Sequence, residues 1–359
     1  MIRSITLNYY FAKEFLKTTV NISAVFFCLG IIINLFEEIN FFKDYDVGIY
    51  LPIILSFFYV PSLFYNMFPF VILLSGIWFF LNIKRTDEIT ALKISGLSNF
   101  SIIIVPGIAS IILGIFFITT INPVTSVLVK KYEKTKGSFE KDKDYLAAIT
   151  VNGIWIKEKK NIIRAAKLDN DKFIEVSIYE FDDENNFLRR LDAKSANINL
   201  KNWILNDVKV IDMNGKTIAE NLSNISYASI YDINQIKSLY SNLDTVSFWS
   251  INEEIELLET RGYSTNEMRS KLHQSLAFPF FLLSMILLSG VISFGFYLKD
   301  NNWNYIFISI ISSVLIFYFN RFSAALGKTD KLPIEISVWM PIVIIFIISS
   351  VGLIHANQK

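Results

Sequence analysis

Long apolar segments occur in two groups along this chain, separated by a more polar middle region. Six segments, each of about 20 or more mostly apolar residues, lie near residues 15–36, 51–82, 99–121, 273–298, 303–325 and 335–356. A helix needs about 20 such residues to cross the hydrocarbon core of a bilayer. The pattern therefore predicts six transmembrane helices, three on each side of the middle region.

The middle region has a different hydrophobic period. From residue 147 apolar residues alternate with polar ones, as in Ile174, Val176 and Ile178, which is typical of half-buried strands. Seven or more short strands without intervening helices predict a sandwich, a barrel or a jelly roll. We therefore expect a polytopic α-helical membrane protein with an inserted all-β domain, divided as 1–125, 126–265 and 266–359.

The composition also indicates a membrane protein. Hydrophobic residues make up 52% of the chain, Phe alone contributes 32 residues, and the mean hydropathy is +0.41. A soluble domain of this composition would leave too much apolar surface in water, so lipid must cover part of it. The net charge of +1 is uninformative by itself. The placement of the charges carries the information.

Basic residues near the ends of the predicted spans lie mainly on one side of the membrane. The other side holds only Lys43, Lys328 and Lys331 in its short loops. By the positive-inside rule, both termini are cytoplasmic and the middle domain lies outside. The basic residues that set this orientation are Arg3, Lys13, Lys17, Lys84, Arg85, Lys93, Lys299 and Lys359.

The sequence offers no catalytic or metal-binding pattern. Cys28 lies inside the first span, so the exported domain must be held together by packing. His273 and His355 are too far apart in the topology to share a metal, and there is no nucleophile–base pair or HExxH motif. Residues 327–329 read Gly-Lys-Thr, but Phe322 replaces the first glycine of a P-loop. We expect no enzyme activity, no cofactor and no metal.

The loop between the second and third spans predicts a short cytoplasmic helix near residues 86–96. Thr86 is a suitable cap, acidic residues suit the positive N-terminal end, and Gly96 can end the helix. From the pattern alone, a membrane-surface helix with solvated charges is the simpler interpretation. The residues singled out in this helix are Asp87, Glu88, Ile89, Leu92 and Gly96.

The run from Asp87 to Ser98 resembles the coupling-helix signature of the lipopolysaccharide-export permeases, the LptF/LptG family. The resemblance extends over the whole chain, as three spans, an outer β-jelly roll and three further spans. Other similar segments are 153–157, 176–181 and 250–279. The segments around Trp155 and Ile178-Tyr179 are more similar to the G subunit than to the F subunit.

The resemblance implies a permease subunit in the bacterial inner membrane, with its middle domain in the periplasm. Implied partners are a homologous permease subunit, a cytoplasmic ATPase dimer, periplasmic jelly-roll bridge proteins and lipopolysaccharide, but no nucleic acid. Glu88 would meet an arginine of the ATPase, because charge-assisted pairing is strong and oriented. Two alternatives stay open: the sister F-type subunit, and a membrane-anchored periplasmic sensor or assembly factor without a transport role.

Candidate lipid-binding residues fall into two sets. The first lies at the outer mouth of the cavity between the spans. There Arg321 can either snorkel to the membrane interface or bind a lipid phosphate, and the lysines can either bind lipid or be simply solvated. Well-studied G subunits carry a lysine near the end of span 1, whereas residues 34–38 here read Asn-Leu-Phe-Glu-Glu. The first set is Asn34, Lys43, Lys130, Lys131 and Arg321. The second, expected inside the jelly roll, is Ile154, Ile156, Ile174, Val176 and Ile178.

Overall fold

The computed structural model forms two compact units, which are described separately. The first comprises Met1–Thr135, Asp244–Ile251 and Asn266–Lys359, and the second comprises Lys136–Leu243 and Asn252–Thr265. The structure describes residues 5–86, 94, 96, 98–139, 145–150, 153–158, 160–169, 172–182, 184, 186–198, 202–213, 216–222, 225–229, 243–260, 265–295, 302–329 and 331–358.

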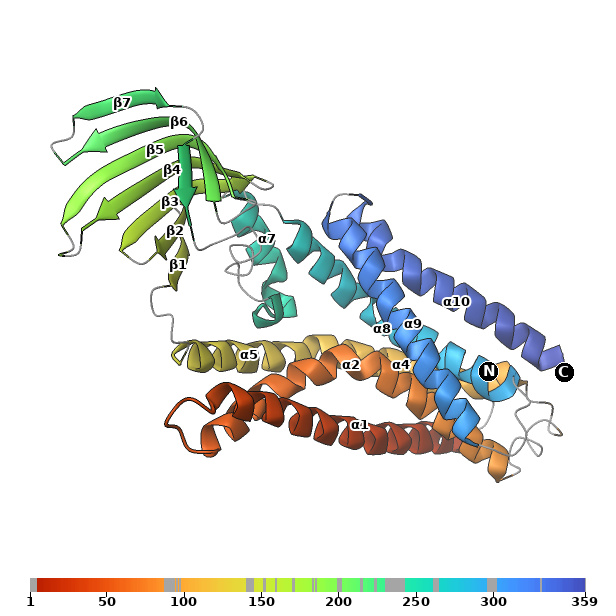
Figure 1. The fold of residues 1–359 in the computed structure, drawn as a ribbon. Helices are drawn as coiled ribbons and strands as arrows, with labels where there is room; N and C mark the ends of the chain where they lie inside the picture. The colour runs from red at the N-terminus through yellow and green to blue at the C-terminus, as the bar shows by residue number, and fades with distance from the viewer. Residues whose placement is uncertain are drawn as a thin grey trace. The chain divides into compact units, whose positions relative to one another are not determined.

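The first unit is helical, and its long helices match the predicted spans (Figure 1). Six helical segments in the described part of the chain are long and apolar enough to cross a membrane, so the prediction of six spans is confirmed. One of these segments is a rod of α4, a π-helical turn η1, and α5. The helices are α1 (Ile5–Phe42), α2 (Tyr50–Arg85), α4 (Asn99–Phe116), η1 (Phe117–Ile121), α5 (Asn122–Gly137), α8 (Asn266–Gly295), α9 (Asn302–Lys328) and α10 (Ile334–Gln358).

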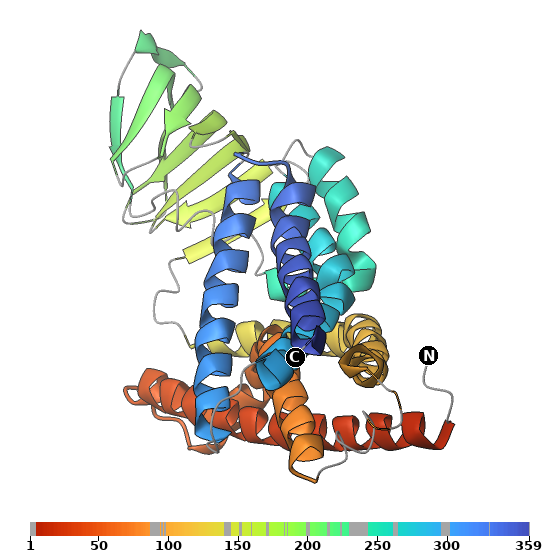
Figure 2. The ribbon, with the colours of Figure 1, turned by 90° about the vertical axis from the view of Figure 1, so that its right-hand side faces the viewer.

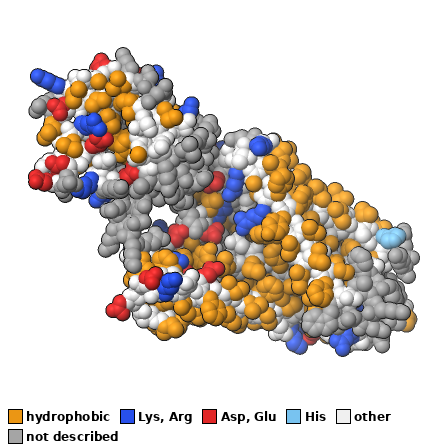
Figure 3. All heavy atoms as spheres, viewed as in Figure 1, with side chains coloured by type: hydrophobic (Ala, Val, Ile, Leu, Met, Phe, Trp, Pro, Cys, Tyr) orange, Lys and Arg blue, Asp and Glu red, His pale blue; other side chains and the backbone are white. Residues whose placement is uncertain are grey.

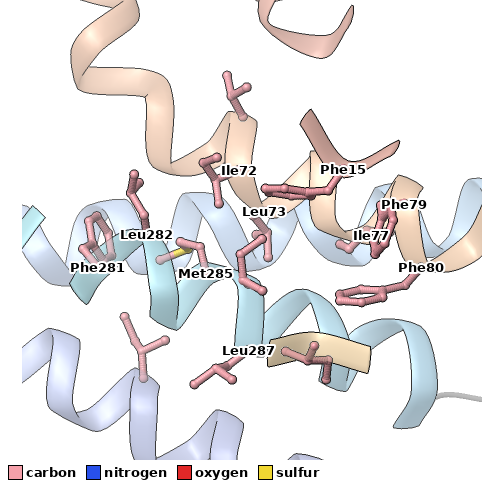
Figure 4. Packing of buried hydrophobic residues seen from close by; sticks show 14 of the residues in the cluster. Phe15, Ile72, Leu73, Ile77, Phe79, Phe80, Phe281, Leu282, Met285 and Leu287 are labelled. Atoms are coloured by element: carbon pink, nitrogen blue, oxygen red, sulfur yellow. The ribbon is translucent and has the colours of Figure 1, made fainter. Parts of the chain in front are cut away.

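Helices α2 and α8 form the centre of the helical unit. Figure 4 shows Ile72, Leu73 and Ile77 of α2 beside Leu282 and Met285 of α8, all buried in one hydrophobic cluster. Helices α8, α9 and α10 pack on one another, as Figure 2 shows from the side. By contrast, α1 and α9 leave many of their apolar side chains exposed, so these faces are available to lipid or to another subunit.

Gly76 permits the close approach of α2 to α8. A Cβ atom at this position would lie 2.2 Å from Oγ of Ser289. We expect Gly76→Leu to destabilise the helical unit, by about 1–3 kcal/mol or more, because the added side chain has to displace α8. The measurement is the thermal unfolding midpoint of the detergent-solubilised protein. Gly48→Leu is the matched control, because a Cβ atom added at Gly48 would meet nothing within 4 Å; equal midpoints for the two variants would contradict this packing role.

A short segment that precedes α7 (Ile251–Thr260) is bonded to the helical unit at the π-helical turn. It contains two 3₁₀ turns, η2 (Leu243–Thr245) and η3 (Phe248–Ser250). The backbone N–H of Phe248 donates to Oδ1 of Asn122 at 2.7 Å. Nε1 of Trp249 donates to the carbonyl of Thr119 at 3.1 Å. The carbonyl of Thr119 in the π-helical turn thus accepts a hydrogen bond from the segment that precedes α7.

The second unit contains an antiparallel sheet in which neighbouring strands follow one another in sequence. The order is β1 to β7, and β8 pairs with β6. The predicted all-β middle domain is confirmed. The strands are β1 (Tyr145–Thr150), β2 (Gly153–Glu158), β3 (Asn161–Asp169), β4 (Lys172–Phe181), β5 (Phe187–Asn197), β6 (Asn202–Asp212), β7 (Thr217–Leu222) and β8 (Ile225–Ala228).

The inward alternation of side chains changes phase within three neighbouring strands, β4, β5 and β6. On β5 the buried residues are Leu191 and Ala193, and then Ala196. On the other two strands a residue with a positive φ marks the change. Glu175 of β4 and Asp207 of β6 have positive φ angles of 51° and 55°, a conformation uncommon outside glycine.

On β4 the buried apolar residues are Phe173 before Glu175, and Val176 and Ile178 after it. The alternation predicted through Ile174 therefore does not continue across Glu175, and Ile174 is only half-buried while Phe173 is fully buried.

The same change of phase occurs on β6, at the level in the sheet where it occurs on β4. Its buried residues are Trp203 and Leu205 before Asp207, and Val208 and Val210 after it. Strand β6 also changes partner at this point, pairing with β8 along its first half and with β7 along its second half. We call the line through Glu175 and Asp207 the phase boundary.

Candidate functional site

Most of the predicted coupling residues, Asp87, Glu88, Ile89 and Leu92, lie outside the residues that the structure describes. Gly96 is described and has a φ of 80°, the left-handed conformation that glycine adopts readily. The hydroxyl of Thr86 bonds back to the carbonyls of Asn82 and Ile83, so this residue ends α2. The role of the coupling residues stays a prediction.

A polar cluster lies where α1, α2 and α5 meet. The hydroxyl of Tyr132 on α5 donates to Oε1 of Glu38 on α1 at 2.7 Å. The ring of Tyr132 stacks on that of Tyr59 from α2, with centroids 4.8 Å apart. One helical turn before Glu38, Nδ2 of Asn34 lies 3.5 Å from Oε2 of Glu37. Asn34 and Glu38 are each only 1% exposed although both are polar.

More acidic groups surround these tyrosines. Glu133 follows Tyr132 on α5, and Asp244 accepts a hydrogen bond from the hydroxyl of Ser62 at 3.0 Å. The carboxylates of Glu37, Glu38, Glu133 and Asp244 all contribute negative potential at the Tyr59 hydroxyl. We call Asn34 and these four acidic residues the carboxylate cluster.

The predicted basic residues are all exposed. Lys43, Lys130 and Lys131 form no ion pair within the described residues. The guanidinium of Arg321 lies over the ring of Phe317 at 5.3 Å and is likewise in no ion pair there. A buried guanidinium would need a carboxylate partner such as Glu37 or Glu38. Arg321 is instead exposed on α9 and needs none.

The sheet encloses an apolar interior. Ile154, Ile156, Val176 and Ile178 are buried in one cluster that also contains Phe173 and Trp203, and Leu258 of α7 packs against it. Four of the five predicted inward residues therefore share this interior, and Ile174 does not. Within it, the rings of Trp203 and Phe173 stand edge to face with their centroids 5.5 Å apart.

One end of the sheet is closed by polar side chains that sequence analysis did not single out. The buried carboxylate of Glu158 on β2 accepts a hydrogen bond from the hydroxyl of Ser229 at 3.1 Å. Asn161 on β3 donates to the hydroxyl of Tyr227 on β8 at 2.9 Å, and Tyr227 also bonds to Glu158. Burial, followed by the nearby carboxylates, raises the pKa of Tyr227 to about 12. A sequence signal existed, because Glu158 continues the inward period of Ile154 and Ile156.

Comparison with known proteins gives one family match. The family model described as the lipopolysaccharide export system permease LptF/LptG matches residues 9–355. The match includes the whole sheet, four of the six apolar helices in full, and all but the outermost residues of the first and the last. A comparison with curated proteins finds no match.

Proposed function

This chain belongs to the LptF/LptG family of lipopolysaccharide export permeases, and on that premise we propose that it is the G-type permease subunit of an ATP-driven exporter. It is a multi-pass membrane protein and a transport subunit. In the proposed cycle, it extracts lipopolysaccharide from the inner membrane and passes it to a periplasmic bridge. ATP is hydrolysed by a separate cytoplasmic ATPase dimer, and a homologous permease subunit completes the membrane complex.

One observation carries the proposal beyond the family match. A single chain joins six membrane-long helices to a sheet whose interior is apolar. Such an interior suits acyl chains, which have to leave the bilayer without entering water. The exposed apolar faces of α1 and α9 support a second membrane subunit. The assignment to the G type rests on the segments around Trp155 and Ile178-Tyr179.

The proposal is tested by purifying the tagged protein from membranes and identifying what accompanies it. We expect a cytoplasmic ATPase, a second protein with the same plan, and lipopolysaccharide. Recovery of a second copy of this chain in place of a homologue would revise the composition of the complex. If no ATPase accompanies the protein under any detergent condition, the sensor or assembly-factor alternative is preferred.

We propose that acyl chains contact the inward side chains of β4, with a pattern set by the phase boundary. Photo-crosslinking residues at Phe173, Val176 and Ile178 should capture lipid, because these three side chains face the interior. Ser177 is the control, because it is not a member of that cluster and its hydroxyl donates to Asp192 at 2.6 Å. Equal capture at all four positions, or none at the inward ones, would argue against an apolar conduit.

Arg321 is proposed to meet an anionic head group. It is exposed near the end of α9, where a guanidinium beside apolar surface reaches toward charged ligands. We expect Arg321→Ala to lower lipid-stimulated ATP hydrolysis by the assembled complex more than the basal rate. A parallel fall in both rates, with loss of stability, would instead assign Arg321 a structural role.

A further inference from the structure

A proline explains why the rod of α4 and α5 contains a π-helical turn. Pro123 is the second residue of α5, which directly follows η1. Proline has no backbone N–H, and in a regular α-helix its ring would collide with the carbonyl four residues earlier, that of Thr119. In η1 the backbone N–H of Asn122 donates to the carbonyl of Phe117, five residues earlier. The rod therefore lacks the N–H that would bond the carbonyl of Thr119 in an α-helix.

The missing donor comes from a distant part of the chain. Hydrophobic side chains cover much of the visible face of the helical unit (Figure 3), and lipid against such a surface offers no hydrogen-bond donor. Nε1 of Trp249 donates to the carbonyl of Thr119 at 3.1 Å. The backbone N–H of Phe248 donates to Oδ1 of Asn122 at 2.7 Å, and Asn122 is buried. The π-helical turn is thus completed by groups from another segment.

This segment, residues 244–251, is also bonded to two other helices, and we call it the strap. Its Asp244 accepts a hydrogen bond from the hydroxyl of Ser62 on α2 at 3.0 Å. Nζ of Lys271 on α8 donates to the carbonyl of Val246, a residue of the strap that is itself buried. The strap therefore joins α2, the rod of α4 and α5, and α8.

Every chain connection between the two units lies on an element that the strap joins. The strap follows Leu243 and precedes Asn252, which both belong to the sheet-containing unit. The boundary after Thr135 lies within α5, and the boundary before Asn266 lies at the start of α8. A displacement of the sheet-containing unit therefore acts on both ends of the strap and on two helices to which the strap is bonded.

We propose that the strap is releasable, that it fixes the angle of α5 at the π-helical turn while bonded, and that movement of the sheet-containing unit releases it. On release, the carbonyl of Thr119 loses the indole N–H, and Pro123 cannot replace it with a helical bond. The turn then holds α5 less firmly, so α5 can change its angle. The inference rests on the proposed function only in assuming that the two units move relative to each other during export.

The position of α5 is measured in the full-length protein by pulsed EPR between two spin labels. The labels are placed at Phe57→Cys on α2 and Lys130→Cys on α5, which are both exposed positions, and Cys28→Ser removes the single native cysteine. We expect one distance population while the strap is bonded. Each strap bond removed should raise the ratio of released to bonded molecules about fivefold, the size of an ordinary hydrogen bond.

Two substitutions remove the bonds at the turn without large changes in side-chain size. Trp249→Phe removes the indole N–H and keeps an aromatic ring, and Asn122→Leu removes the acceptor for Phe248. The double variant should show a second distance population. Trp78→Phe is the matched control, because Trp78 is exposed on α2 and its side chain makes no hydrogen bond within the described residues.

A double variant that unfolds at a lower temperature but keeps a single distance would overturn the proposal, because the strap would then only stabilise the fold. A second population of equal size in the Trp78→Phe control would overturn it too, since the effect would not depend on the strap.

The assembled complex tests whether the strap is released during the transport cycle. With the unaltered strap, ATP hydrolysis should produce the same second distance that the double variant shows. If export proceeds while the distance stays single, the strap is not released and the inference is wrong. Failure of the proposed function is distinguishable. Absence of an ATPase partner contradicts the exporter and leaves the distance change in the double variant intact, whereas a single distance in that variant contradicts only the releasable strap.

Discussion

Replacing Glu88 with alanine is expected to abolish lipopolysaccharide export while leaving the protein inserted in the membrane. Glu88 lies in the loop between the second and third spans, two residues after Thr86, the C-cap of α2. The loop carries Ile89 and Leu92, which can pack on a partner while the carboxylate pairs with an arginine. Removing one member of such a pair leaves the other charge uncompensated, and this typically costs about 2–5 kcal/mol.

The measurement is ATP-dependent release of lipopolysaccharide from reconstituted vesicles, alongside co-purification of the ATPase. Thr86→Ala is the control, because Thr86 bonds to α2 and not to the predicted partner surface. Charge reversal, Glu88→Arg, should be rescued by an acidic residue in place of the matching ATPase arginine. Full export by the alanine variant would remove Glu88 from the coupling mechanism.

Replacing Glu158 with alanine is expected to open the end of the sheet where β8 meets β2 and β3. The buried carboxylate accepts hydrogen bonds from the hydroxyls of Ser229 and Tyr227. In the alanine variant both hydroxyls lose this acceptor. Each buried polar group left unsatisfied costs about 1–3 kcal/mol. Hydrogen exchange of the full chain should show faster exchange in β8 and in the adjoining ends of β2 and β3.

Glu220→Ala is the matched control for this measurement. Glu220 on β7 pairs with Lys209 at 2.8 Å, but both side chains are exposed, so the pair contributes less than about 1 kcal/mol. Its removal should leave exchange in β8 unchanged. If both variants accelerate exchange equally, Glu158 has no special role at this end of the sheet.

The same polar group predicts a response to alkaline pH. The pKa of Tyr227 is about 12 in the fold against 10.0 for the free side chain, because burial disfavours the phenolate. Between these values the unfolded tyrosine loses its proton while the folded one keeps it. The contribution of Tyr227 to stability is therefore complete below pH 10 and lost as the pH rises to about 12. Tyr227→Phe should reduce this alkaline loss, which is measured as the pH dependence of β8 exchange.

The sequence is sufficient for the six spans, because each apolar run is long enough to identify a membrane helix without knowledge of its neighbours. It is also sufficient for the existence of the sheet. The alternation in the sequence wrongly predicts that Ile174 faces the interior. The positive φ at Glu175 shifts the alternation, and the order of polar and apolar residues does not reveal this backbone conformation. The contact between Tyr132 and Glu38 joins residues far apart in the chain, so it emerges only from the packing of α1 against the rod that α4, η1 and α5 form.

The phase boundary has a consequence for how the strands find their alignment during folding. In a regularly alternating strand, a slip of one residue exposes the apolar face and is strongly disfavoured. A slip of two residues keeps the apolar side chains on the buried face, so the hydrophobic pattern does not disfavour it. Here the changes of phase on β4 and β6 face the same residue of β5, Lys194, because Ile174 pairs with Ser195 and Val208 with Ala193. A two-residue slip would move one boundary away from the other and bury polar side chains on one side of it. The changes of phase at Glu175 and Asp207 therefore favour a single register of these strands over the slipped ones.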